Sequence, residues 1–133
     1  MAYYPFYPQF QSQQTNVIWV DKLVGDCVIR AVSIVLNQTW QETYIDLCII
    51  GYEMCDLPSS NAVWSAYLRD KGFKRHAILF PYDYTINDFC VDFTQGMYVV
   101  CTGTHTVAVI DGVAYDSWPS GEESPQFYFA KEK

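Results

Sequence analysis

The sequence predicts an α+β fold in which helices from the N-terminal half pack on an antiparallel sheet from the C-terminal half, one layer on the other. Between residues 27 and 71, apolar side chains recur at helical spacing. After Phe73 they gather instead in short runs separated by turn-forming residues. Two of these runs are joined by Asp111-Gly112, a dipeptide typical of the two-residue turn of a β-hairpin.

The chain of 133 residues is long enough for one hydrophobic core and too short for two of ordinary size. Residues 1–15 are rich in Tyr, Pro and Gln, and almost no aliphatic side chain occurs among them. They are therefore predicted to form a flexible arm. Residues 16–133 are predicted to form a single domain, beginning with an extended apolar segment at 16–20.

Capping residues delimit the predicted helices. Asn37 tolerates the left-handed conformation and is expected to end the first helix. Thr39 and Glu42 match a capping box at the start of the second helix. Ser60 is expected to cap the third helix, and Gly72 to end it. The resulting helices span about 27–36, 39–54 with the cap included, and 61–71.

The C-terminal half contains five runs that are typical of strands. The first lies within 73–80, and a short helix capped by Thr85 follows it. The other four strands are predicted at 97–101, 105–110, 113–116 and 126–129.

Composition and charge exclude several classes of partner. The net charge is −7 and no basic run occurs, which argues against nucleic acid, because phosphate binding requires clustered Lys and Arg. No segment approaches the roughly 20 apolar residues of a membrane span. The N-terminus lacks the pattern of a secretory signal. The odd number of cysteines without tight spacing predicts a reducing, cytoplasmic location. The sequence does not indicate an oligomeric state.

The chain has five cysteines, an odd number without tight spacing, so a disulfide framework is not expected. The spacings typical of zinc sites are also missing from the sequence, and no metal or other cofactor is predicted. Apart from Cys27, the cysteines are expected to be core residues, namely Cys48, Cys55, Cys90 and Cys101.

A thiol, an imidazole and a carboxylate each occur in a context that suits catalysis. Cys27 follows Gly25-Asp26 and opens the first predicted helix, whose N-terminal field favours thiolate, the nucleophilic form. His105 begins a predicted strand, and Asp116 ends the strand that follows the hairpin turn. A neighbouring imidazole can take the proton of the thiol, and an acid can orient that imidazole. Cys27, His105 and Asp116 are therefore the predicted catalytic residues.

These motifs, in this order, resemble those of the papain-like cysteine peptidases. In that family the cysteine heads the central helix, the histidine lies on the following sheet, and the third member commonly belongs to an Asn-Ser-Trp motif. Asp116-Ser117-Trp118 resembles that motif with aspartate in place of asparagine, a variant that the family accepts. The resemblance implies a papain-like fold, a peptide or protein substrate, and a Trp118 indole that shields the acid–histidine hydrogen bond from water.

A closer likeness is to small proteins encoded by bacteriophages and prophages, and it covers about residues 16–130. It implies a phage or prophage origin, and hence the cytoplasm of a host cell. The matching pieces are Gly25 to Ala31, Trp40 with Glu42, Gly96 with Tyr98, His105, and Tyr115-Asp116-Ser117-Trp118.

One feature departs from the family pattern. Papain-like peptidases usually carry a glutamine five or six positions before the cysteine, and its side chain helps to bind the oxyanion. Lys22 and Asp21 occupy those positions here. Asn16 is the preferred replacement and Gln14 the alternative, while the backbone N–H of Cys27 would supply the second donor. Loss of one such donor typically slows a reaction by about 10²–10³.

Other functions fit the same residues. The triad is shared by peptidases, amidases, thioesterases and acyl transferases. A catalytically weak papain-like scaffold could instead bind a protein partner, or the domain could be structural, with the thiol and the imidazole far apart. Cys27 could be a structural thiol, His105 a satisfied sheet-edge histidine, and Asp116 a cap for the turn before Pro119.

Arg30 lies one turn after the predicted nucleophile within an apolar helix, so its charge must be paired or reach solvent. Asp26 and Asp46 are the candidate partners.

Overall fold

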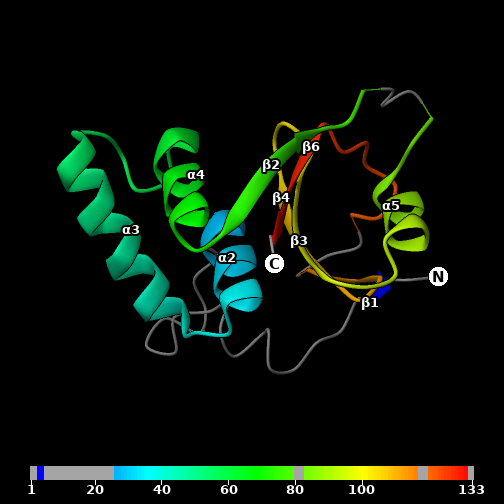
Figure 1. The fold of residues 1–133 in the computed structure, drawn as a ribbon, viewed down its shortest axis with the longest axis horizontal. Coiled ribbons are helices and arrows are strands. Elements are labelled where there is room, and N and C mark those ends of the chain that lie inside the picture. Colours follow the sequence, from blue (N-terminus) through cyan, green and yellow to red (C-terminus); the bar gives the residue numbers. More distant parts are fainter. Residues whose placement is uncertain (1–2, 5–25, 80–82, 117–119, 132–133) are drawn as a thin grey trace.

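The computed structural model describes residues 3–4, 26–79, 83–116 and 120–131. The predicted α+β class is confirmed: three helices precede the main strands, and a fourth, shorter helix lies between strands in the described part of the chain (Figure 1). The elements are β1 Tyr3–Tyr4, α2 Cys27–Leu36, α3 Trp40–Met54, α4 Asn61–Asp70, β2 Phe73–Ala77, α5 Ile86–Asp92, β3 Met97–Cys101, β4 Thr106–Ile110, β5 Val113–Tyr115 and β6 Phe127–Lys131.

The described strands form one sheet in the order β1-β5-β4-β3-β6-β2. The strands from β2 to β6 pair antiparallel, as predicted. β1 runs parallel to β5, with Tyr3 opposite Ala114. This strand belongs to the segment for which a flexible arm was predicted, and a strand of two residues has no hydrophobic period that could reveal it. The extended segment predicted at 16–20 lies outside the described residues.

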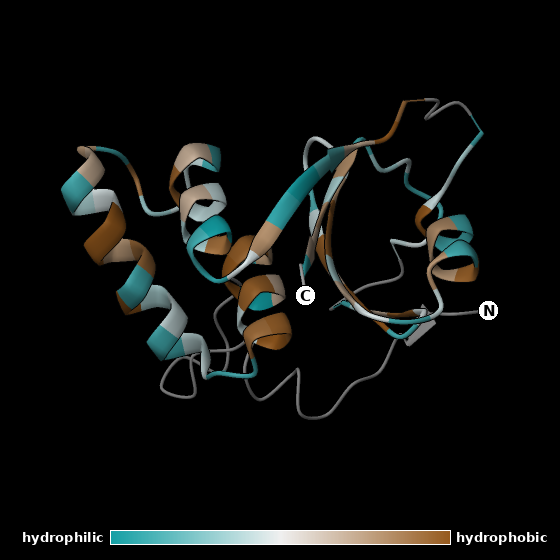
Figure 2. Ribbon diagram, viewed as in Figure 1, coloured by the Kyte–Doolittle hydropathy of each residue, from teal (hydrophilic) through white to brown (hydrophobic). Residues whose placement is uncertain are grey.

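Helices cover both faces of the curved sheet. α2, α3 and α4 lie on one side and α5 on the other (Figure 1). The first side buries Leu47, Trp64 and Phe129 in one cluster, and the second buries Phe89 and Val107 in another. The N-terminal helices therefore pack on the C-terminal sheet, as predicted, and the short helix α5 covers the opposite face in addition. The hydrophobic helix α2 occupies the centre of the first layer (Figure 2).

Local signals fixed the element boundaries as predicted. Asn37 adopts φ 54° and ends α2. The capping box of α3 is complete, because the Thr39 hydroxyl accepts from the Glu42 N–H at 3.0 Å and the Glu42 carboxylate accepts from the Thr39 N–H at 3.0 Å. Asp111 and Gly112 both have positive φ, at 51° and 78°, as a type I′ hairpin turn between β4 and β5 requires.

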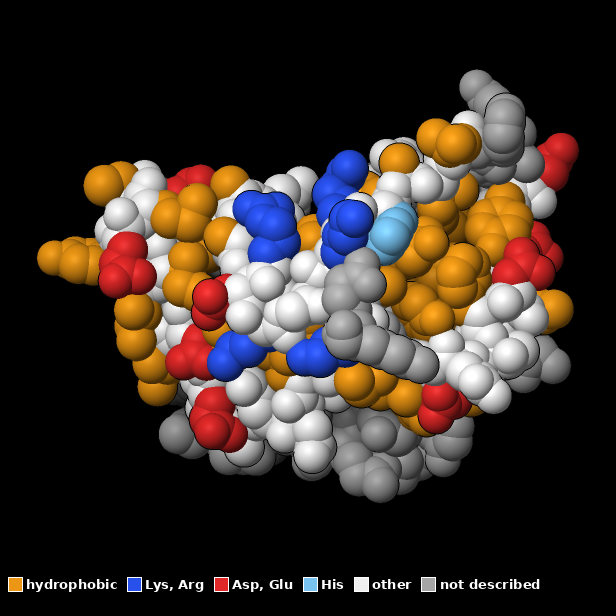
Figure 3. Space-filling model, in the orientation of Figure 1, with side chains coloured by type: hydrophobic (Ala, Val, Ile, Leu, Met, Phe, Trp, Pro, Cys, Tyr) orange, Lys and Arg blue, Asp and Glu red, His pale blue; other side chains and the backbone are white. Residues whose placement is uncertain are grey.

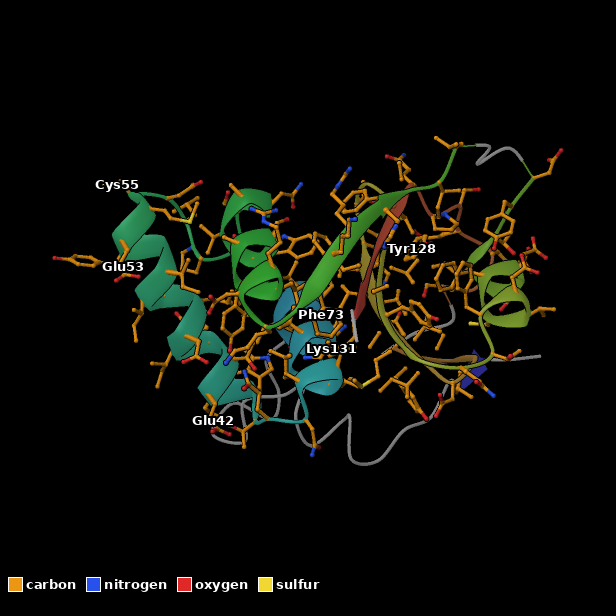
Figure 4. The ribbon with its side chains drawn as sticks, viewed as in Figure 1. Glu42, Glu53, Cys55, Phe73, Tyr128 and Lys131 are labelled. Atoms are coloured by element: carbon orange, nitrogen blue, oxygen red, sulfur yellow. The ribbon has the colours of Figure 1, made fainter. Side chains whose placement is uncertain are left out.

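Helix α3 packs on the domain through one narrow face and exposes the other. Ile45, Ile49 and Tyr52 follow each other at helical spacing, with exposed fractions of 56%, 53% and 86%. Cys55, at its C-terminal end opposite Glu42 (Figure 4), is exposed, and Cys48 is half-buried. The prediction that these two cysteines are core residues was wrong, because α3 is the outermost helix of its layer. Cys90 and Cys101 are buried, as predicted.

None of the helices in the described part of the chain is long and apolar enough to cross a membrane.

Candidate active site

The thiol lies at the N-terminus of the central helix. Cys27 is the first residue of α2 and is half-buried. Asp26 precedes it in the N-cap position, yet its carboxylate does not cap the helix. That carboxylate instead accepts from the Trp40 indole at 2.8 Å and pairs with Arg30. The first N–H groups of α2 are thus not consumed by a side-chain cap, and they surround the thiol with a positive field.

The imidazole is held by the turn between β3 and β4. The Thr102 N–H donates to the His105 carbonyl at 2.9 Å, and the His105 N–H donates to the Thr102 hydroxyl at 3.1 Å. These reciprocal bonds close a tight loop in which Gly103 has φ +106°. His105 therefore has a fixed backbone immediately before β4, and its side chain is only 9% exposed.

The carboxylate follows β5 and is 2% exposed. Asp116 Oδ2 lies 2.7 Å from His105 Nε2 and also accepts a hydrogen bond from the Ser120 hydroxyl. Asp116 Oδ1 lies 3.7 Å from Arg30 Nη1. The acid is thus held in place by three side chains, and it faces the imidazole directly rather than only capping a turn.

The contact between the Cys27 thiol and the His105 imidazole joins the three predicted catalytic residues. Cys27 and His105 share a side-chain hydrogen bond. Because Nε2 of the ring engages Asp116, Nδ1 is the nitrogen that serves the thiol. The structure therefore brings Cys27, His105 and Asp116 together in the order that a nucleophile, a base and an orienting acid require. Their catalytic roles stay predictions.

Electrostatics in the site favour a thiolate–imidazolium pair. Burial acts to raise the pKa of Cys27, but the hydrogen bond and charge of His105 outweigh it and hold the pKa below the ordinary 9.0. A backbone hydrogen bond from Thr106 and the charge of Arg30 act in the same direction. Burial acts to lower the pKa of His105, but Asp116 and Cys27 raise it to about 9. The shifts of the two pKa values therefore both act towards proton transfer from sulfur to nitrogen.

Arg30 connects the helix to the acid. Its guanidinium pairs with Asp26 on its own helix and lies beside Asp116 after β5. Asp26 was one of its two predicted partners. The other, Asp46, accepts instead from the Tyr67 hydroxyl. Burial raises the pKa of the Asp26 carboxyl, although Arg30 and the Trp40 indole act to lower it. Arg30 therefore links α2, the helix that carries Cys27, to Asp116 by an ionic contact, in addition to the contacts through His105.

A small cleft opens beside the thiol. Its volume is about 130 Å³. Cys101 lies in its wall, 3% exposed, and burial raises the pKa of this second thiol to about 12. The lining residues are Cys27, Val28, Asn61, Trp64, Cys101, Gly103, Thr104, His105, Thr106 and Phe127.

Two predicted site residues, Asn16 and Trp118, lie outside the described residues. Two others were missed by sequence reasoning. Ser120 contacts Asp116 from four positions further along the chain, in a segment without periodicity. Asn61 reaches the cleft from the first turn of α4. Only the tertiary fold brings Asn61 to the thiol, so the sequence contains no local signal for it.

Comparisons with known proteins do not assign the chain. No protein-family model matches the sequence, and neither curated proteins nor solved structures gave a match. Within the described residues, no group of three or more His, Cys, Asp or Glu side chains is placed to hold a metal ion.

Proposed function

We propose that this protein is a small papain-like cysteine hydrolase, encoded by a phage or prophage, that cleaves a peptide, isopeptide or related amide bond through a thioester on Cys27. The observation that carries the proposal is the chain of contacts from Cys27 through His105 to Asp116, in which the acid–imidazole distance is 2.7 Å. The three side chains come from α2, from the β3–β4 turn and from the end of β5.

The first half-reaction forms the thioester. His105 takes the proton of Cys27, and the thiolate attacks the carbonyl carbon of the substrate, so that an S–C bond forms. The negative charge on the carbonyl oxygen is stabilised by the N–H groups at the start of α2. As the C–N bond breaks, the imidazolium of His105 gives its proton to the leaving amine.

The second half-reaction regenerates the thiol. Water attacks the thioester carbon while His105 takes a proton from that water. The C–S bond then breaks, the substrate leaves as a carboxylic acid or carboxylate, and sulfur recovers its proton from the ring. Asp116 accepts a hydrogen bond from the ring throughout. It fixes the orientation and tautomer of His105 and stabilises its charged form.

Alkylation of the thiol tests the activation on which this chemistry depends. We expect iodoacetamide to label Cys27 rapidly well below pH 9.0, the ordinary thiol pKa, because the thiolate is stabilised in the site. The measurement is the rate of adduct formation against pH, with each adduct assigned by peptide mass mapping. Exposed Cys55 is a reference thiol in the same chain.

Two variants separate the site from the rest of the protein. His105→Ala should shift the labelling profile of Cys27 towards that of an ordinary thiol. His76→Ala removes the other of the two histidines and should leave the profile unchanged. Labelling of Cys27 that is no faster than labelling of Cys55 would contradict the proposal.

Turnover is tested with an activated ester. The wild-type protein should form an acyl adduct on Cys27 that decays with time, whereas Cys27→Ala should keep its fold and form none. Catalysis that survives in Cys27→Ala would show that the mechanism is wrong.

A second function, protein binding by a catalytically weak scaffold, is favoured by one observation. The outer face of α3 and the turn after it expose large apolar side chains, among them Tyr52 at 86% and Leu57 at 69%. Exposed apolar clusters often mark protein–protein contacts. An unreactive Cys27 together with the failure to form an acyl adduct would make this second function the better account.

A further inference from the structure

The cleft beside Cys27 is walled by aromatic rings. Trp64 and Phe127 lie in parallel, with ring centroids 6.4 Å apart and an interplanar angle of 14°. Trp64 is only 1% exposed and fixes the position of this wall. None of the residues that line the cleft carries a carboxylate. A substrate group that enters the cleft therefore meets apolar surface and hydrogen-bond donors.

A guanidinium lies over one end of the wall. The Arg75 side chain, from strand β2, lies with its guanidinium carbon 4.2 Å from the centroid of the Phe127 ring. Burial raises the pKa of Cys101 in the cleft wall, and the charge of Arg75 acts in the opposite direction. The cation–π contact places Arg75 beside the Phe127 ring, which lines the cleft, and the edge of the guanidinium carries hydrogen-bond donors.

An amide donor is held at the other end. The Asn61 Oδ1 atom accepts a hydrogen bond from the Trp64 indole at 3.0 Å. Because the oxygen is engaged in this way, the Nδ2 group of Asn61 provides the two remaining donors of the amide. Asn61 also lines the cleft. The hydrogen bond from the Trp64 indole thus orients the Asn61 amide so that its N–H groups are available to a group bound in the cleft.

The face formed by α4, β2 and β6 carries basic side chains in a chain of net charge −7, and Arg75 is the member of this group that contacts a residue of the cleft wall. Figure 3 shows Lys and Arg side chains gathered on the face formed by α4, β2 and β6. Lys131 of this group lies over the Phe73 ring at the start of β2, with Nζ 5.3 Å from the centroid (Figure 4). The exposed basic residues of these elements are Arg69, Lys71, Lys74, Arg75 and Lys131.

We propose that the cleft is a substrate subsite for an acidic side chain, Asp or Glu, of the peptide that Cys27 attacks, with Arg75 and Asn61 as the recognition residues. This inference rests on the proposed function and names its substrate class. A guanidinium and an amide N–H both donate charge-assisted hydrogen bonds to a carboxylate, and the guanidinium adds its own positive charge. The volume of about 130 Å³ leaves room for one side chain of the substrate.

Paired electrophilic peptides test the subsite. Each peptide carries a C-terminal vinyl sulfone that alkylates a reactive thiol, and each pair differs only by Asp or Glu against Asn or Gln at one position. At one position the acidic peptide should label Cys27 about tenfold faster than its amide twin, which corresponds to one charge-assisted hydrogen bond. The readout is the mass of the Cys27 adduct against time.

Matched variants identify the residues responsible. Arg75→Glu should reverse the preference, so that a Lys-containing peptide reacts faster than the acidic one. Lys74→Glu makes the same change of charge on the neighbouring residue, whose side chain points to the opposite face of the sheet, and should keep the acidic preference. Asn61→Asp keeps an acceptor for the Trp64 indole but removes the donors, and should slow the acidic peptide.

The outcomes separate the subsite from the hydrolase. Equal rates for acidic and amide twins at every position, with iodoacetamide still labelling Cys27 faster than Cys55, would overturn the acidic subsite alone. An acidic preference that persists in Arg75→Glu would overturn the assignment of Arg75. Iodoacetamide labelling of Cys27 at the rate of Cys55 would overturn the hydrolase and, with it, the subsite.

Discussion

At the scale of single residues, the site depends on where one proton resides. His105 lies between a thiol and a carboxylate, is 9% exposed, and has a pKa of about 9 against an ordinary value of 6.5. The folded protein therefore holds this proton more tightly than the unfolded chain does. The resulting stabilisation is complete below pH 6.5 and is lost as the pH rises through about 9.

We therefore expect His105→Gln to be destabilised in a pH-dependent manner. Its deficit in the free energy of unfolding should be largest near about pH 6, on the order of 2 kcal/mol, and should shrink towards about pH 10. Urea unfolding at several pH values measures the deficit, and His76→Gln serves as the control for loss of an imidazole. A deficit that stays constant over this range would show that the folded ring does not carry the raised pKa.

Much of the triad could be predicted because each member has a local signature. Cys27 opens a helix, His105 follows a turn, and Asp116 leaves a hairpin, and all three positions can be recognised from the neighbouring residues. Ser120 and Asn61 could not be predicted in this way, because their contacts join segments that are related only by the fold.

At the scale of elements, α2 contributes two residues to the site. It carries Cys27 at its first position and Arg30 one turn later. The guanidinium of Arg30 lies between two carboxylates that are each 2% exposed, those of Asp26 and Asp116. Without the positive charge of Arg30, both carboxylates would stay buried without that cation beside them, and this lowers the free energy of unfolding.

Arg30→Met should accordingly destabilise the protein by about 3–5 kcal/mol. Urea unfolding at neutral pH measures the loss. The second substitution Asp26→Asn, made in the same chain, should recover part of it, because one of the two buried charges is then removed. Arg69→Met, on the exposed surface of α4, is the control and should change the stability by less than about 0.5 kcal/mol. A loss below about 1 kcal/mol for Arg30→Met would show that the buried acids do not depend on it.

Element boundaries were predicted well wherever a cap or a turn has a chemical signature. The capping box at Thr39 and the Asp111-Gly112 turn lie where the sequence placed them. The strands were shorter or longer than predicted by up to a few residues, because strand ends depend on pairing with a neighbour. β1 could not be foreseen at all, since its only support is its pairing with β5.

At the scale of the whole molecule, the site joins the helical layer to the sheet. Cys27 comes from the layer formed by α2, α3 and α4, whereas His105 and Asp116 come from the sheet. The side of the sheet on which α5 packs could not be read from its sequence, because its cap fixes where it begins but not what it covers. The helix itself was predicted from the Thr85 cap, but its place on the opposite face of the sheet was not.

Because the nucleophile and its base come from different layers, thiol activation should be lost together with the fold. In a urea series at about pH 7, the rapid labelling of Cys27 should disappear at the same midpoint as the circular dichroism signal. The labelling of Cys55 should change little, because this thiol is already exposed in the folded state. Loss of activation at distinctly lower urea would show that the two layers separate before the domain unfolds.

Cys101, the second thiol in the cleft wall, bears on how the protein responds to oxidation by peroxide. A sulfenic acid on Cys27 is rescued internally only if a nearby thiolate attacks it and closes a disulfide. Cys101 is the neighbouring sulfur, but with a pKa of about 12 it stays protonated and is a poor attacker. Oxidised protein would then proceed to the sulfinic stage unless an external reductant intervenes, so the reduced state of Cys27 depends on the reducing power of its surroundings.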